Sequence, residues 1–484
     1  MPQIATAEPT RSAPKFAATA VLPIAAVTAL AHCVATLLGT GYWFDEVYML
    51  AIGRYHLDWG SADQPPAAAA LAALMDAAAP ESVFALRVPA MVATTVAVVL
   101  AAMIAREFGG ERRAQTLTAV TQATALWPTL TGHWLTPYTL EPVQWLAIMW
   151  LLIRWIRVRD DRLLVALGVV VGLAVMTKFQ VLLLCAVLLV CIAVCGPRDL
   201  LRRPALWLGA TIAIAVAAPT LWWQQSHGWP QLQMTRVVAG EAEALYGGRP
   251  GVAVQLIVYA GVLGVVLGLY GAWQLLRAPH WRQYRFIAAT AVVLYVVFVA
   301  TLGRPYYLAG LYGVLAAAGA VSLQLRRADK PANRLWPARV GVLASVATAV
   351  LILVFSVGAT RSDIGEKIAR TTAQVYQNLP GTQREHTALL GESYIVAAYL
   401  DGYAPRYALP PAYSTNRSYG YFAAPADSVD TVLYVGRSPE PVRRYFGSAD
   451  KLGTVNDDLG IYVLRGRQQP WQQIWPQLRT LTVS

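Results

Sequence analysis

Long apolar runs separated by short, basic connections fill most of the first 358 residues, and they constrain the fold more than any other feature. A run of roughly 20 apolar residues is long enough to cross the hydrocarbon core of a bilayer. Charged residues make up 14% of the chain, whereas about a quarter is usual in soluble globular proteins, and the mean hydropathy is +0.45. The sequence therefore predicts an α-helical polytopic membrane protein.

The apolar runs follow one another at intervals that let the chain cross a membrane back and forth. The run 163–195 is long enough for a pair of helices, and we expect it to turn at Lys178, its one charged residue. With this turn, the sequence predicts about 11 transmembrane helices. They are expected within residues 16–40, 83–108, 115–131, 139–156, 163–195, 205–223, 251–276, 286–301, 306–325 and 340–356.

The connections on alternate sides of the predicted membrane differ strongly in basic content. We count 17 Lys and Arg residues on one side and 6 on the other. Because Lys and Arg are retained on the cytoplasmic side, this asymmetry predicts a cytoplasmic N-terminus and an extracytoplasmic C-terminal segment. The preference for Arg over Lys is typical of a GC-rich genome, so we expect a bacterial cytoplasmic membrane. The net charge of +12 lies in these scattered connections, which argues against a nucleic-acid partner.

The C-terminal segment changes character after the last apolar run. Its apolar stretches are short, and they predict a helix near residues 364–375 and strands at 387–391, 431–435 and 460–464. We therefore expect two domains, a transmembrane domain at residues 1–358 and a small extracytoplasmic α/β domain at residues 359–484.

Acidic side chains gather in the connection 41–66, which we expect to be an outer loop after the first span. Asp45 and Glu46 are adjacent there, and Asp63 leads an Asp-Gln-Pro-Pro sequence. Ionisable groups at a membrane edge are candidates for function, and a carboxylate beside a proton-bearing acceptor is able to act as a general base. The pair alone does not distinguish a base from a metal ligand, and simple solvation of loop acids is the alternative.

Several cations and aromatic residues are expected on the same outer side. Lys178 would be costly within a span, so it either reaches the headgroups or binds an anion. With Arg304, Arg87 and Arg236 it forms a group that suits a lipid phosphate. Aromatic residues such as Tyr306 are typical of the interfacial belt of a membrane protein, although the same residue types line sugar and prenyl-chain grooves. The outer connection 224–250 is expected to be a long loop.

The order of the motifs along the chain resembles a known family. It is similar to the bacterial branch of the protein-mannosyltransferase-like glycosyltransferases, family 39 of the GT-C superfamily. The matching stretches are Phe44–Glu46, Asp63–Pro66, Arg87–Ala90, Leu135–Pro142, Thr177–Phe179, Leu221–Pro230, Gly303–Ala309, Gly391–Tyr394 and Ser414–Tyr419.

The resemblance implies a GT-C enzyme that transfers a sugar, with inversion, from a polyprenyl-phosphate donor to an acceptor on the outer face. It implies catalytic roles for Asp45, as base or acceptor-orienting carboxylate, and for its neighbour Glu46. The residues implied to bind the donor phosphate, sugar or lipid are Asp63, Lys178, His227, Arg304 and Tyr306.

Two further expectations concern single residues of the matching motifs. Arg87 is expected either to join the functional cations or simply to organise the start of the second span. Relatives often carry His where this chain has Gln64, so no cofactor is expected and a divalent metal has no support from the sequence.

The alternative is a non-catalytic membrane protein that binds or translocates lipid-linked sugars. It would use the same cations and aromatic residues without needing Asp45, and it would have polar or broken helices from one face to the other. In either case, the expected partners are a polyprenyl-phosphate sugar and membrane lipids, without nucleic acid. For the enzyme, a lipid, a polysaccharide and a protein are all open as acceptor, and the sugar is open too.

Overall fold

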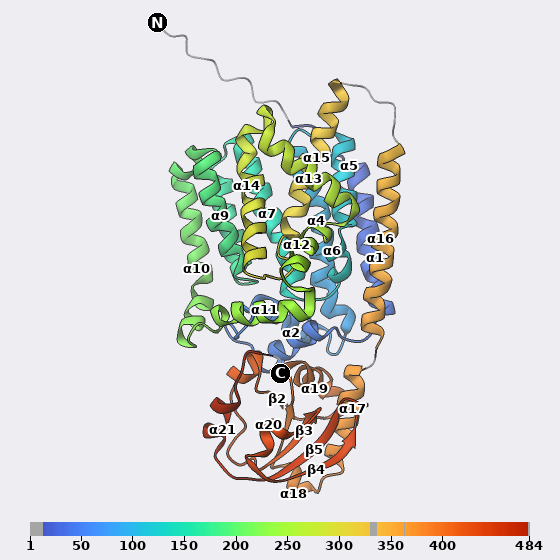
Figure 1. Ribbon diagram of the computed structural model, residues 1–484, viewed down its shortest axis with the longest axis vertical. Helices are drawn as coiled ribbons and strands as arrows, with labels where there is room; N and C mark the ends of the chain where they lie inside the picture. Colours follow the sequence, from blue (N-terminus) through green and yellow to red (C-terminus); the bar gives the residue numbers. More distant parts are fainter. Residues whose placement is uncertain (1–12, 330–335, 363, 483–484) are drawn as a thin grey trace.

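The computed structural model describes residues 13–329, 336–362 and 364–482. Figure 1 shows a bundle of helices with a smaller sheet-bearing unit at one end. We call the elements from α17 (Ile364–Gln377) onward the C-terminal unit, the bundle end beside it the proximal end, and the opposite end the distal end. The predicted class, a helical membrane bundle with a small C-terminal α/β portion, is confirmed.

Every predicted apolar run coincides with helix in the bundle. The elements are α1 (Ala18–Leu38), α4 (Val83–Glu107), α5 (Arg112–Ala123), α6 (Leu126–Thr131), α7 (Pro137–Val158), α8 (Arg162–Val175), α9 (Gln180–Cys195), η1 (Arg198–Arg202), α10 (Pro204–Ser226), α12 (Gly248–Val258), α13 (Gly261–Arg277), η2 (Pro279–Tyr284), α14 (Arg285–Ala300), α15 (Ala309–Asp329) and α16 (Trp336–Arg361). Within the described residues, five helices are long and apolar enough to span a membrane, or six if α12 and α13 form one bent span. The chain is thus a multi-pass membrane protein, and the number 11 stays a prediction.

Two of the predicted continuous spans are broken. The pair α12 and α13 bends by 91° at Gly261, whose φ is +77° and whose missing Cβ would lie 2.7 Å from the carbonyl oxygen of Thr124. The run 115–131 divides into α5 and α6 because Pro128 has no N–H to donate to Thr124, four residues earlier.

Helices at the proximal end replace two expected loops, so that part of the prediction is wrong. The connection 41–66 contains α2 (Phe44–Tyr55), and the connection 224–250 contains α11 (Pro230–Tyr246). Acids in the first turn of α2 match the helix dipole, and Pro230 occupies the first position of α11, where its missing N–H costs nothing. A further helix, α3 (Ala67–Ala78), follows the acidic motif.

The C-terminal unit contains a five-stranded sheet with strand order β2-β1-β3-β5-β4. Strands β1 (Thr387–Gly391), β3 (Thr431–Gly436) and β5 (Gly460–Arg467) confirm the predicted positions. Strand β1 is parallel to β2 and β3, whereas β5 is antiparallel to β3 and β4. The sequence missed β4 (Phe446–Thr454), an edge strand with mostly exposed side chains and no apolar alternation, and the two-residue β2 (Ala412–Tyr413). The remaining elements are α18 (Gly381–Arg384), α19 (Tyr394–Tyr407), η3 (Arg417–Tyr421), α20 (Glu440–Arg443) and α21 (Trp471–Leu478).

A continuous apolar core joins the C-terminal unit to the bundle. Helix α2 packs on α19, and Val47 and Tyr48 share one buried cluster with Ala397 and Leu400. The two helices approach so closely that a Cβ on Gly402 would lie 2.2 Å from Val47 Cγ2. This contact places the loops of the C-terminal unit over the proximal end of the bundle.

Candidate active site

A polar cavity of about 550 Å³ lies at the proximal end, between the bundle, α2, α11 and the C-terminal unit. Three acidic and three positively charged side chains line it, and aromatic side chains form much of the remaining wall. The charged residues are Asp45, Asp63, Lys178, Glu241, Arg304 and Arg417. The aromatic residues are Trp43, Phe44, Trp127, Tyr138, Tyr246, Tyr306, Tyr307 and Tyr394.

Asp45 faces this cavity from the first turn of α2. The hydroxyl of Tyr138 donates a hydrogen bond to Asp45 Oδ2 at 3.1 Å, and Trp43 Nε1 donates to the same hydroxyl at 2.8 Å. Trp43 in turn stacks on Trp134 with ring centroids 4.2 Å apart, which holds the arrangement in place. Burial raises the pKa of Asp45 to about 6, although the Tyr138 hydrogen bond opposes this change. The carboxylate is therefore ionised at neutral pH and takes up a proton in mild acid.

Glu46 points away from the cavity, although it is adjacent to Asp45 in sequence. It forms an ion pair with Arg87, and neither side chain has any exposed surface. Arg87 Nη1 also donates to Gly39 O at 2.6 Å and Nη2 to Gly41 O at 2.8 Å. The expectation that Glu46 shares the site with Asp45 is therefore not met, and of the two expectations for Arg87 the structural one holds.

Lys178 lies in the turn between α8 and α9, with its side chain in the cavity. Its Nζ is 3.2 Å from Glu141 Oε2 and lies 4.7 Å and 4.5 Å from the ring centroids of Tyr306 and Tyr307. The alternative in which Lys178 extends to the lipid headgroups is wrong for this structure. One carboxylate does not use all three donors of an ammonium group, so Lys178 has capacity to bind a further anion.

Arg304 and Arg417 lie on the two sides of Glu241, a residue of α11. Arg304 pairs with Glu241 Oε2, and Arg417 Nη2 donates to Oε1 at 2.6 Å. Arg304 belongs to the connection before α15, whereas Arg417 belongs to η3 of the C-terminal unit. Among the described residues, Arg304 Nη1 and Arg417 Nε are buried without a hydrogen-bond acceptor.

Asp63 joins the cavity wall to the C-terminal unit. Its Oδ1 accepts hydrogen bonds from the hydroxyls of Tyr48 at 2.9 Å and Ser418 at 2.6 Å. The backbone N–H of Ser418 donates to the Tyr48 hydroxyl at 3.1 Å, which closes a small network beside Arg417.

His227 does not reach the cavity and lies at the C-terminal end of α10. It stacks on Trp223 with ring centroids 3.9 Å apart and makes a local contact with the Trp223 carbonyl. The structure therefore does not bring His227 together with the other predicted site residues, and its place beside the sugar or lipid stays a prediction. Tyr306, by contrast, lines the cavity and stacks on Trp127 with centroids 4.2 Å apart.

The cavity therefore brings together Asp45, Asp63, Lys178, Arg304 and Tyr306, all expected from the sequence. Sequence reasoning missed Tyr138, Glu141, Glu241 and Arg417. Two short stretches, Leu135–Pro142 and Ser414–Tyr419, contain three of these residues and already carried the family resemblance. Nothing in the sequence singled out Glu241. Across the described part of the chain, no group of three or more His, Cys, Asp or Glu is arranged to hold a metal ion.

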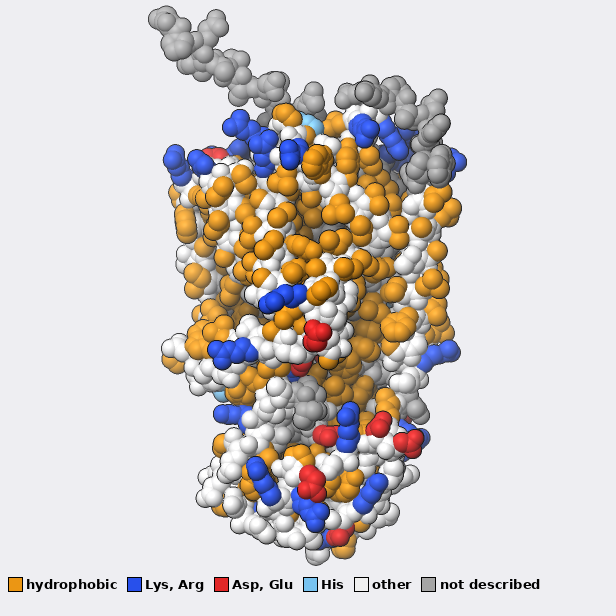
Figure 2. All heavy atoms as spheres, in the orientation of Figure 1, with side chains coloured by type: hydrophobic (Ala, Val, Ile, Leu, Met, Phe, Trp, Pro, Cys, Tyr) orange, Lys and Arg blue, Asp and Glu red, His pale blue; other side chains and the backbone are white. Residues whose placement is uncertain are grey.

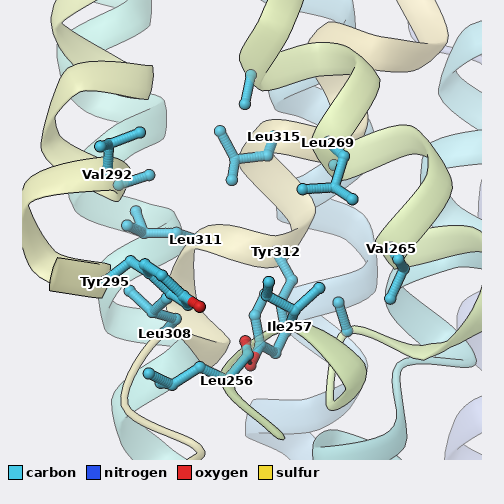
Figure 3. A pocket seen from close by; sticks show the side chains of 15 residues that line it. Leu256, Ile257, Val265, Leu269, Val292, Tyr295, Leu308, Leu311, Tyr312 and Leu315 are labelled. Atoms are coloured by element: carbon cyan, nitrogen blue, oxygen red, sulfur yellow. Dashed lines mark hydrogen bonds between the residues drawn. The ribbon is translucent and has the colours of Figure 1, made fainter. Parts of the chain in front are cut away.

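An apolar cavity of about 240 Å³ lies between α12, α13, α14 and α15. Figure 3 shows Leu256, Leu308 and Tyr312 at its lower part and Val292 and Leu269 higher up. Val292 is 48% exposed and Leu269 is 55% exposed, so the cavity opens toward the surrounding membrane. Leu308 lines the apolar cavity and directly follows Tyr306 and Tyr307 in the sequence, which line the polar cavity.

Comparisons with known proteins show the fold and a family similarity over about a third of the chain. Residues 63–223 match the family model of the dolichyl-phosphate-mannose-protein mannosyltransferases. The fold is similar to that of ArnT from Cupriavidus metallidurans bound to undecaprenyl phosphate, with a TM-score of 0.66 and 14% identity, over 92% of this chain and 98% of that one. A search of curated proteins gave no significant match.

A second similarity is more distant but points to the same fold. The archaeal oligosaccharyltransferase AglB from Archaeoglobus fulgidus, solved with an inhibitory peptide and a dolichol-phosphate, has a TM-score of 0.51 and 13% identity. That comparison covers 88% of this chain and 70% of AglB. Together with the ArnT similarity, it shows the fold of this chain, and residues 63–223 are similar to the dolichyl-phosphate-mannose-protein mannosyltransferase family.

Proposed function

We propose that this chain is an inverting glycosyltransferase that transfers a sugar from a polyprenyl-phosphate donor to an acceptor on the outer face of a bacterial cytoplasmic membrane. The observation that carries the proposal is that Asp45 shares one cavity with Lys178 and Arg304. A base and a phosphate-binding pair in one cavity are what a single displacement at a sugar phosphate needs.

Lys178 and Arg304 are the proposed partners of the donor phosphate. The guanidinium of Arg304 has a buried donor, Nη1, with no acceptor among the described residues, and such donors bind phosphate oxygens strongly. As the bond between the sugar and the phosphate breaks, negative charge grows on the phosphate, and these cations stabilise that charge in the transition state.

Asp45 is the proposed base on the acceptor. Its carboxylate removes the proton of an acceptor hydroxyl while the oxygen attacks the anomeric carbon from the face opposite the phosphate. The electrons of the broken bond leave with the polyprenyl phosphate, and the configuration at the anomeric carbon inverts. A base whose pKa is about 6 is ionised at neutral pH and retains appreciable basicity, and the Tyr138 hydroxyl orients it.

The apolar cavity in Figure 3 is the proposed site of the prenyl chain. It is open toward the membrane, so a prenyl chain that already lies in the hydrocarbon core is able to enter it from the side. The solved relatives support this donor class, because ArnT was crystallised with undecaprenyl phosphate and AglB was solved with a dolichol-phosphate.

The charge distribution supports an outward orientation of the polar cavity. Figure 2 shows Lys and Arg side chains gathered at the distal end of the bundle. Arg106, Arg154 and Arg157 all pair there with the buried Glu107. By the positive-inside rule, the distal end is cytoplasmic, and the cavity then faces the other side.

The test is sugar transfer by the purified protein in liposomes, with a panel of labelled polyprenyl-phosphate sugars and candidate lipid, polysaccharide and peptide acceptors. We expect transfer from one donor, with inversion seen by NMR of the product, and loss of transfer in Asp45→Asn. Asp58→Asn, which removes a neighbouring acid outside the cavity, is the control. Retention of configuration, or equal transfer by Asp45→Asn, contradicts the proposal. Donor binding without turnover in any combination favours a binding or translocating protein instead.

A further inference from the structure

Glu241 occupies an unusual position between two arginines that come from different parts of the chain. Each of its carboxylate oxygens accepts from one guanidinium, with Arg304 on Oε2 and Arg417 on Oε1. A carboxylate held by two guanidinium groups in this way has the charge and the hydrogen bonds of a bound anion. The Glu241 carboxylate in the cavity wall thus resembles the donor phosphate that Arg304 is proposed to bind.

The two arginines are not saturated by this contact. Arg304 Nη1 and Arg417 Nε are buried without an acceptor among the described residues. A buried donor without a partner costs about 1–3 kcal/mol, so an anion with more oxygen atoms than Glu241 offers would bind more favourably. A phosphate group has such oxygens.

Arg417 is held in place with backbone strain. Its φ is +52°, a left-handed conformation that costs a non-glycine residue about 1–3 kcal/mol and that clusters at functional sites. The next residue, Ser418, is tied to Asp63 and Tyr48 by hydrogen bonds. The C-terminal unit therefore presents Arg417 to the cavity in a defined orientation.

Helix α11, which carries Glu241, is bounded by residues suited to a hinge. Gly228 and Trp229 at its start have φ of +75° and +56°, and Gly247 and Gly248 at its end have φ of +74° and +66°. Such left-handed residues interrupt the helical hydrogen bonding on both sides. A rotation about these residues would take Glu241 away from the arginines.

We propose that Arg417, from the C-terminal unit, is a phosphate-binding residue. In the absence of ligand, Glu241 occupies the position of the phosphate, and the phosphate of the lipid-linked ligand then displaces Glu241 from both arginines. The inference rests on the proposed function for the identity of the ligand, a phosphate ester of a long-chain alcohol. The exchange is one anion for another, so no covalent step is involved. It gives the C-terminal unit a direct part in binding.

The experiment measures binding of a polyprenyl monophosphate without sugar to the full-length protein in detergent, by quenching of tryptophan fluorescence. We expect Glu241→Gln to bind about 10-fold more tightly, a difference of about 1.4 kcal/mol, because the competing carboxylate is gone. Arg417→Met is expected to bind about 10-fold more weakly, with partial recovery in Arg417→Lys. In the double variant, the gain from Glu241→Gln should largely disappear, because the two residues act on each other.

Glu243→Gln is the matched control, because it removes the same charge from an exposed position of the same helix. If the tighter binding by Glu241→Gln does not come from simple loss of a negative charge, the affinity of Glu243→Gln for the lipid phosphate should stay within about twofold of the parent. Unchanged or weaker binding by Glu241→Gln overturns the inference, as does equal tightening by Glu243→Gln. If Glu241→Gln does not fold, Glu241→Asp, whose shorter side chain reaches the arginines less well, should bind more tightly than the parent.

Binding and transfer fail separately in this design. If the parent protein binds the lipid phosphate with the expected pattern of variants but transfers no sugar, the exchange of Glu241 stands and the proposed enzymatic function falls. If sugar is transferred but the variants bind the lipid phosphate with equal affinity, the proposed enzymatic function stands and the exchange of Glu241 falls.

Discussion

Two groups of charged residues lie close together at the proximal end of the bundle, and they differ in how completely they are paired. In the pair Arg87–Glu46, each guanidinium nitrogen has an acceptor, and water has no access. In the cavity, Arg304 and Arg417 each have a buried nitrogen without an acceptor among the described residues. The first group is complete without a ligand, whereas the second has binding capacity left over.

Asp45 and Glu46 belong to different groups, although they are neighbours in the sequence. Asp45 and Glu46 are consecutive residues of α2, so their side chains point in directions about 100° apart around the helix axis. One direction leads to the cavity and the other leads into the protein toward Arg87. We infer that adjacent acids at a membrane edge form a functional pair only if both have access to the same space.

The largest effect on stability should come from breaking the complete pair. Replacing Arg87 with Met leaves Glu46 buried without its partner, which typically costs about 3–5 kcal/mol. We expect a strongly lowered thermal unfolding midpoint in detergent, with recovery when Glu46→Gln is combined with it. An unfolding midpoint close to that of the parent protein would mean that the pair is not structural.

The incomplete group should respond most strongly in binding and turnover. Replacing Lys178 or Arg304 with Met removes one charge-assisted hydrogen bond to the donor, each worth about 1.5–3 kcal/mol, so kcat/KM should fall about 10- to 100-fold. Arg236, which the sequence grouped with these cations, is exposed on α11 and does not line the cavity, so Arg236→Met is the control. A lowered unfolding midpoint without any effect on kcat/KM would mean that these cations are structural, like the pair Arg87–Glu46.

The pH dependence of transfer sharpens the role of Asp45. Its folded pKa is raised to about 6, and a base must be deprotonated, so kcat/KM should fall as the pH drops below this value, by about tenfold per unit. Tyr138→Phe removes a hydrogen bond that lowers this pKa, and the acid limb should move to higher pH. A profile that is flat between pH 5 and pH 7 would exclude Asp45 as the base.

The smallest effect is expected at His227. Its ring stacks on Trp223 outside the cavity, so His227→Ala should change kcat/KM by less than about twofold, as is usual for surface sites away from the chemistry. A much larger loss would return His227 to the site residues.

The apolar runs of the bundle were predictable because they depend on composition within each segment. Continuous apolar runs placed α4 and α10 to within three residues at each end. Helices α2 and α11 were missed because neither is apolar enough to stand out, and both are stabilised by contacts at the proximal end. The strands β1, β3 and β5 were found because they are short apolar segments in a polar context.

The site was predictable only where one stretch of sequence carried both the residue and its chemistry. Asp45, Lys178 and Arg304 stood out as charges in apolar or aromatic surroundings. Arg417 comes from the C-terminal unit and Glu241 from α11, and their meeting depends on how distant elements pack. The separation of Glu46 from Asp45 depended on the position of Arg87, 41 residues further along the chain.

The most direct test of the account compares Asp45→Asn with Glu46→Gln in the same assays of sugar transfer and thermal unfolding. We predict that Asp45→Asn lowers transfer by about 10²- to 10⁴-fold, the usual contribution of a general base, with an unchanged or higher unfolding midpoint. Glu46→Gln should instead lower the unfolding midpoint, because it leaves Arg87 without its counter-charge, while the protein that remains folded transfers sugar. The opposite pattern, with transfer lost in Glu46→Gln at full stability and retained in Asp45→Asn, would contradict the assignment of the two carboxylates.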